Sequence, residues 1–75
     1  MADTDTDPMD ELAQLADDLT ALAAAAQSTI DTLDRMDAEG RPGRQARALA
    51  ARYAAGRMDA FEYAARQIHE LLAPF

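Results

Sequence analysis

His69 is the only histidine in the chain, and no cysteine accompanies it. A metal ion bound there would need carboxylates as further ligands, and Glu62 and Glu70 are the nearest candidates along the sequence. Arg66 lies four residues from each of these glutamates, the spacing at which opposite charges pair on a helix surface. We therefore expect ordinary ion pairs around His69 and no metal site.

Nucleophilic catalysis has a single serine candidate, Ser28, which lies inside a helical pattern with no base close to it in the sequence. The chain also has only three glycines, and none forms the glycine-rich loop that cradles a phosphate group. The sequence therefore predicts no catalytic residue, no cofactor and no small-molecule substrate, so we do not expect an enzyme.

The acidic stretch from Asp3 to Asp7 resembles the opening of a calcium-binding loop, in which alternate carboxylates face a hard cation. The resemblance stops there. Pro8 stands where such a loop needs its turn glycine, and Gln14 stands where it needs a bidentate glutamate. We expect a solvated tail here and no calcium site.

Two short series of charged residues stand on either side of a predicted reversal of the chain. Three arginines recur at every third position: Arg41, Arg44 and Arg47. Three aspartates recur in the same way before them: Asp31, Asp34 and Asp37. The arginines alone would suit phosphate groups, but the net charge of −7 opposes direct nucleic-acid binding. We expect the two series to pair with each other inside the fold.

The composition is that of one small acidic domain. The chain has 75 residues, a net charge of −7 and no apolar run of the roughly 20 residues that span a membrane. Residues 1–39 hold eleven acids and one arginine, whereas residues 40–75 hold six arginines and three acids. The halves either neutralise each other or leave an acidic arm for a basic protein partner. We expect residues 1–7 to form a disordered acidic tail and residues 8–75 a single helical domain in the cytoplasm.

A long helix is predicted over residues 8–38. Asp7 can cap its first turn and Pro8 suits its first position, while Gly40 supplies the left-handed residue that ends it. An apolar stripe with spacings of three and four runs through Leu12, Leu15, Leu19, Leu22, Ala26, Thr29, Leu33 and Met36.

The stretch from Gly56 to Tyr63 reads as a junction between two helices. Gly56 suits the position after a helix, and Asp59 can cap the next helix with Glu62 completing a capping box. Met58 and Tyr63 stand where a hydrophobic staple would place them. The sequence therefore predicts a turn here between helices at about 43–55 and 60–72.

This all-α architecture leaves part of the first helix uncovered. The two predicted C-terminal helices are too short, at about 1.5 Å per residue, to cover residues 8–38 along their whole length. Because large apolar stripes are rarely left exposed, we expect a dimeric helical bundle. Alanines permit close helix packing, although alanine is also simply the best helix former. They stand at positions 23 to 26 and at 46, 50, 54, 64 and 65.

The same junction carries a family resemblance. The segment Gly56-Arg57-Met58-Asp59, followed after two residues by Glu62-Tyr63 and later by Arg66, resembles the pattern of the SHOCT family, the short C-terminal domain. The resemblance covers about residues 46–72. It implies a two-helix hairpin, usually attached to something larger, that helps proteins to oligomerise or to contact other proteins.

These observations favour a protein-interaction module that docks helix on helix and forms a homodimer. The predicted contact residues are four leucines and two acids: Leu12, Leu15, Leu19, Leu22, Asp17 and Asp18. In this hypothesis the leucines anchor the partner and the acids select a basic surface. The alternative is an acidic inhibitor or antitoxin-like regulator that occupies a basic nucleic-acid-binding surface of a partner protein. No membrane partner is expected.

Overall fold

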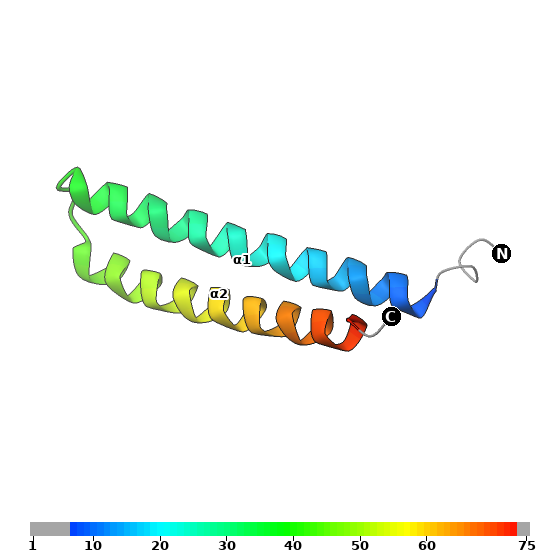
Figure 1. Ribbon diagram of the computed structural model, residues 1–75. Coiled ribbons are helices and arrows are strands. Elements are labelled where there is room, and N and C mark those ends of the chain that lie inside the picture. The colour runs from blue at the N-terminus through cyan, green and yellow to red at the C-terminus, as the bar shows by residue number, and fades with distance from the viewer. Residues whose placement is uncertain (1–6, 74–75) are drawn as a thin grey trace.

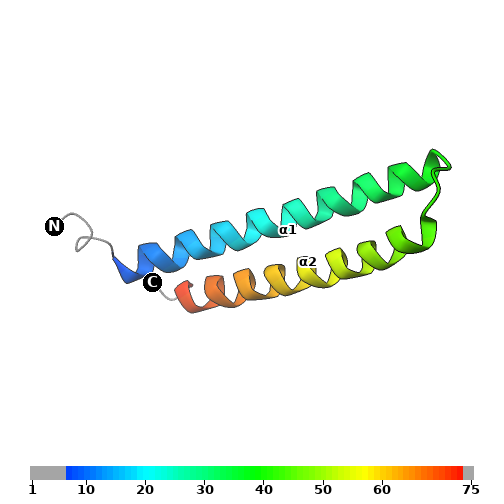
Figure 2. The ribbon, with the colours of Figure 1, turned by 180° about the vertical axis from the view of Figure 1, so that it is seen from behind.

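The computed structural model describes residues 7–73, which form two antiparallel α-helices of similar length joined by a short loop (Figure 1). Helix α1 spans Pro8–Ala38 and helix α2 spans Arg44–Leu72. The two helices lie side by side from the loop to the opposite end, where α1 begins and α2 ends (Figure 2). The all-α class and the first helix at 8–38 are confirmed.

Helix α1 begins as its sequence predicts. The Asp7 carboxylate accepts a hydrogen bond of 2.9 Å from the Met9 backbone N–H, and Pro8 occupies the first helical position. Asp10 and Glu11 place negative charge in the first turn, where the helix dipole favours it. The predicted tail otherwise lies outside the described residues, which begin at Asp7.

The loop ends α1 with a Schellman motif. Gly40 adopts φ +74°, its N–H donates to the Asp37 carbonyl, and the Arg41 N–H donates to the Met36 carbonyl. Gly43, with φ +92°, then precedes the first residue of α2. The predicted helix end at Gly40 is therefore confirmed, and the chain reverses within five residues.

The predicted junction at Gly56 is wrong, because α2 continues through it without a break. The proposed turn residues Gly56, Met58, Asp59, Glu62 and Tyr63 are all helical, and Gly56 has no positive φ. The separate helices at 43–55 and 60–72 are one helix of 29 residues. The argument that the C-terminal part is too short to cover α1 falls with them.

The physical reason is an unbroken heptad pattern in α2. Buried or half-buried side chains alternate at spacings of four and three on both sides of Gly56. They are Arg47, Ala51, Ala54, Met58, Phe61, Ala65, Ile68 and Leu72. A glycine inside a helix costs only about 1 kcal/mol relative to alanine. Breaking the helix would disrupt this whole series, so the helix continues.

Alanines form the centre of the contact between the helices. The buried apolar residues among those described are Ala16, Ala23, Ala26, Ala54 and Ala65. In α1 the inward series is Leu12, Ala16, Leu19, Ala23, Ala26, Ile30 and Leu33. It shares Leu12, Leu19, Ala26 and Leu33 with the predicted stripe. Leu15, Leu22 and Thr29 of the stripe are replaced by their next neighbours Ala16, Ala23 and Ile30, while Met36 is half-buried. Alanines therefore take two of the positions that the stripe gave to leucine.

The hairpin is a single layer of helices. Its Cα radius of gyration is 17.1 Å, compared with about 11 Å for a compact domain of this length. Within residues 7–73, no apolar side chain larger than alanine is buried. The structure therefore lacks the second layer against which helices ordinarily bury their larger apolar groups. Neither described helix is both long and apolar enough to cross a membrane.

Candidate protein-interaction surface

The line of contact between the helices divides the hairpin into two broad faces. Each face carries a groove lined by both helices. We call the face that contains His69 and Glu62 the polar face, and the face that contains Leu22 and Phe61 the apolar face. Because the helices are antiparallel and in heptad register, residues seven apart on one helix lie on the same face.

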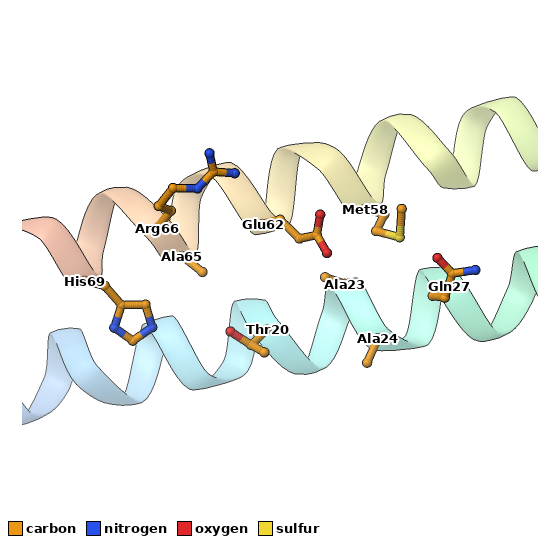
Figure 3. A pocket seen from close by; sticks show the side chains of 9 residues that line it. All are labelled: Thr20, Ala23, Ala24, Gln27, Met58, Glu62, Ala65, Arg66 and His69. Atoms are coloured by element: carbon orange, nitrogen blue, oxygen red, sulfur yellow. The ribbon is translucent and has the colours of Figure 1, made fainter.

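The polar face has a shallow groove over Ala23 and Ala65 (Figure 3). Helix α2 contributes His69, which points toward α1, and Arg66, which points away from it (Figure 3). Thr20 and Gln27 of α1 complete the polar rim. These polar side chains are exposed, so water competes for each hydrogen bond that a ligand would make.

Nothing on the polar face concentrates reactive groups. The described residues include no group of three or more histidine, aspartate or glutamate side chains that would hold a metal ion. The ion pairs predicted between Arg66 and its neighbours Glu62 and Glu70 do not form, since neither ion pair within residues 7–73 includes Arg66. The groove offers scattered charges suited to weak surface contacts.

The apolar face has a groove of different chemistry. Its lining is Leu22, Ala25, Ala26, Thr29, Ala50, Tyr53, Ala54, Arg57 and Phe61. Arginine is the only charged type in this lining. Alanines lower the floor of the groove between the helices, while one leucine and two aromatic rings border it. Such a surface fits apolar side chains from another helix.

Four large apolar side chains on this face are exposed. Leu22 is 45% exposed and Tyr53 is 67% exposed. Leu15, one heptad before Leu22, is 46% exposed, and Leu71, two heptads after Arg57, is 64% exposed. The apolar face therefore extends beyond the groove toward the open end of the hairpin. Single exposed leucines are ordinary on proteins, but aligned groups indicate an interaction site.

Arg57 is held in place by the aromatic residues of the apolar face. Its Nη1 donates a hydrogen bond of 3.1 Å to the Tyr53 hydroxyl oxygen. Its Cζ atom lies 5.5 Å from the centroid of the Tyr53 ring and 5.3 Å from that of Phe61. Both distances are within the range of cation–π attraction. The charge is thus oriented before any partner arrives, which reduces the entropy lost on binding.

The predicted pairing of acidic and basic series occurs at one position. Arg47 pairs with Asp37 across the loop, with Nε and Oδ1 2.6 Å apart. Arg41 pairs instead with Glu39, with Nε and Oε1 2.9 Å apart. Arg44 takes part in neither pair. The charge asymmetry of the chain is therefore only partly balanced by ion pairs among the described residues.

The structure separates the predicted contact residues into two groups. Leu12 and Leu19 are half-buried in the series that faces α2. Leu15 and Leu22 are exposed on the apolar face. The two acids also separate, because Asp18 lies one heptad before Ala25 on the apolar side, whereas Asp17 lies one heptad before Ala24 on the polar side. The prediction that all four leucines lie together on one exposed stripe is therefore wrong.

Sequence reasoning missed the contribution of α2 to this surface. Tyr53, Arg57, Phe61 and Leu71 were each assigned to one of two short helices or to the junction between them. The signal that would have found them is the seven-residue spacing of Ala50, Arg57, Ala64 and Leu71 across Gly56. It becomes visible only when α2 is treated as continuous.

A comparison of the chain with protein-family models, curated proteins and solved structures found no match. The two-helix hairpin that the SHOCT resemblance implies for residues 46–72 is not present, because these residues lie within one helix. The resemblance itself stays a prediction. The apolar face is therefore interpreted from its own geometry.

Proposed function

We propose that this protein is an interaction module that binds helical surfaces of proteins through its apolar face. The observation that carries the proposal is the alignment of four exposed side chains on the apolar face: Leu22 and Tyr53 border its alanine-floored groove, and Leu15 and Leu71 extend the face beyond it. Binding, rather than catalysis, is the function that suits this chemistry. Self-association is one form that this docking takes.

The single-layer fold supports this proposal. A two-helix layer leaves its larger apolar groups half-covered, and a third or fourth helix on the apolar face would bury them. Burial of apolar area stabilises by about 25 cal/mol per Å². Leu22 and Phe61, at the centre of the face, are the expected anchors, because binding energy concentrates in central side chains that become fully buried. Asp18 and Glu11 at the edge of the face would favour a partner with basic groups.

The experiment compares two exposed leucines. Leu22 lies on the apolar face, whereas Leu49 is 62% exposed and points away from both helices' line of contact, one heptad before Gly56. Tagged wild-type, Leu22→Asp and Leu49→Asp proteins are used as baits in lysate of the source organism that contains the untagged chain. We expect the wild type and Leu49→Asp to retain the same proteins, including untagged copies, and Leu22→Asp to lose them.

The matched design separates charge from position. Both substitutions change the net charge by one unit and add the same side chain to an exposed helical site, so a general charge effect would appear in both. Circular dichroism of each variant establishes that the helices persist. Equal retention by the two variants would contradict the proposal that the apolar face is the binding surface.

A second candidate is an acidic regulator that occupies the nucleic-acid-binding surface of a basic protein. The feature that favours it is a row of exposed carboxylates on one edge of α1, at Asp10, Asp17 and Asp31. None of the three takes part in the ion pairs of residues 7–73. Binding by this edge would weaken steeply with salt and would survive Leu22→Asp. Binding by the apolar face would show the opposite dependence.

A further inference from the structure

We propose that the apolar face is covered by a second copy of this chain, and that α1 of each copy packs on α2 of the other. This inference rests on the proposed function and specifies its partner and orientation. The product is a four-helix bundle with a two-fold axis parallel to the helices. In such an isologous contact every pair of contacting residues occurs twice, once in each direction between the two copies.

The size of the face suits a second hairpin. From Leu15 to Met36 the face is about 32 Å long at 1.5 Å per residue, and two helices make it about 20 Å wide. This gives a flat area of about 600 Å², similar in scale to the roughly 800 Å² of accessible surface that each partner buries in a standard interface. A second copy offers a face of the same length and width.

The charges on the face select the orientation. Helix α1 contributes two acids, Glu11 and Asp18. They lie two heptads and one heptad before Ala25, which lines the groove, so they lie on the same face. Helix α2 contributes a cation, Arg57. A two-fold axis across the helices would place α1 on α1 and gather the acids of both copies on one side of the bundle. An axis along the helices places the acidic α1 on the α2 that carries Arg57, so the acids of the two copies lie on opposite sides of the bundle.

The register within the hairpin determines which residues then meet. Asp37 is paired with Arg47, and the helices run in opposite directions. Each residue counted back along α1 therefore corresponds to one counted forward along α2. By this count Leu15 lies within one helical turn of the level of Leu71. A two-fold axis along the helices preserves these levels, so Leu15 of one copy packs on Leu71 of the other.

The groove makes the same arrangement sterically reasonable. By the same count Ala25 and Ala60 lie within one residue of the same level, and both are small and exposed. They allow α1 of one copy to approach α2 of the other closely in the middle of the face. Gln14 donates a hydrogen bond of 2.9 Å to the Asp18 carboxylate, which leaves the second carboxylate oxygen of Asp18 able to accept from the other copy.

The absence of cysteine from the sequence permits a direct test by disulfide trapping. Leu15→Cys and Leu71→Cys are made on separate chains with different tags, mixed, and oxidised under mild conditions. We expect the mixed 15–71 disulfide to dominate over the 15–15 and 71–71 products. An axis across the helices would separate positions 15 and 71, so a statistical mixture or a preference for 15–15 product would overturn the orientation.

Two controls keep the test decisive. Leu49→Cys, mixed with Leu15→Cys, places the second thiol on an exposed site away from the apolar face and is expected to give little product. Ala25→Cys with Ala60→Cys repeats the experiment at the centre of the face with smaller substitutions. If both pairs behave like the Leu49→Cys control, the second-copy arrangement is wrong.

Analytical ultracentrifugation of the wild type distinguishes this inference from the function on which it rests. We expect a concentration-dependent dimer that becomes a monomer in Leu22→Asp but not in Leu49→Asp. A wild type that stays monomeric at all concentrations overturns the second copy. If Leu22→Asp nevertheless abolishes capture of another protein, the proposed function stands without it. If capture is also insensitive to Leu22→Asp, both fail.

Discussion

Arg47 at the start of α2 lies 2.6 Å from the Asp37 carboxylate at the end of α1, although Arg47 is only 8% exposed. Its guanidinium also donates to two loop carbonyls, through Nη1 to that of Pro42 and through Nη2 to that of Arg41. One side chain therefore ties both helices to the loop. The planar, forked shape of the guanidinium is what allows three acceptors to be reached at once.

We expect Arg47→Ala to lower the free energy of unfolding by about 1–3 kcal/mol, because it removes the donor of three part-buried hydrogen bonds. Arg47→Lys should recover only a small part, since an ammonium group cannot reproduce the fork. Urea denaturation at a fixed protein concentration measures both changes. Arg44→Ala, at an exposed site on the same turn, is the control and should stay within about 0.5 kcal/mol of wild type. Wild-type stability in Arg47→Lys would contradict the role of the fork.

Gly56 and Gly40 should respond in opposite directions to alanine. A Cβ atom at either position meets no atom within 4 Å, so space does not distinguish them. Gly56 has ordinary helical geometry, and Gly56→Ala should stabilise by about 0.5–1 kcal/mol. Gly40 has φ +74°, where an L side chain costs about 1–2 kcal/mol. Gly40→Ala should therefore destabilise.

Thermal unfolding followed by circular dichroism tests this pair. The result at Gly56 also decides between a continuous α2 and the turn that its sequence suggests. A left-handed turn residue at position 56 would make Gly56→Ala destabilising, as at Gly40. Destabilisation of both variants would therefore contradict the continuous helix.

Local signals predicted the ends of α1 because each depends on a few adjacent residues. Asp7 with Pro8 at one end and Gly40 at the other act through the backbone within one turn. The same local signals failed at Gly56 to Tyr63. A capping-box pattern of Asp59 and Glu62 is equally compatible with the exposed surface of a continuous helix. Whether the chain turns or stays helical there depends on the contact between α2 and α1 along their whole length. No local sequence pattern contains that information.

For a related reason, the sequence predicted Leu15 and Leu22 as contact residues but not their separation from Leu12 and Leu19. The three- and four-residue spacing of the leucines in α1 predicts one stripe that holds Leu15 and Leu22 together with Leu12 and Leu19. The actual line of contact prefers Ala16 and Ala23, because small side chains let two long helices approach closely. The side-chain size that a contact prefers depends on the distance between the helices. That distance is set by α2, so the sequence of α1 alone did not reveal it.

The Asp7 cap should contribute measurably to the stability of α1. Asp7→Ala removes the acceptor for the Met9 N–H and should cost about 0.5–2 kcal/mol. Asp7→Asn keeps an acceptor at the same place and should cost much less. Denaturant titration compares the two variants. An equal loss in both would show that the negative charge near the helix dipole, rather than the hydrogen bond, provides the stabilisation.

Ala23 should not tolerate a larger side chain, because it is 4% exposed at the centre of the contact between the helices. Ala23→Leu adds three carbon atoms there, so the helices must separate or the side chain must adopt a strained rotamer, at a cost of about 1–3 kcal/mol. Ala21→Leu makes the same change at an exposed site of the same helix and controls for helix propensity, which is similar for both residues. Urea denaturation of both variants should show a loss confined to Ala23→Leu. If Ala23→Leu instead matched or exceeded wild-type stability, the helices would have room between them, and the contact would not depend on alanine.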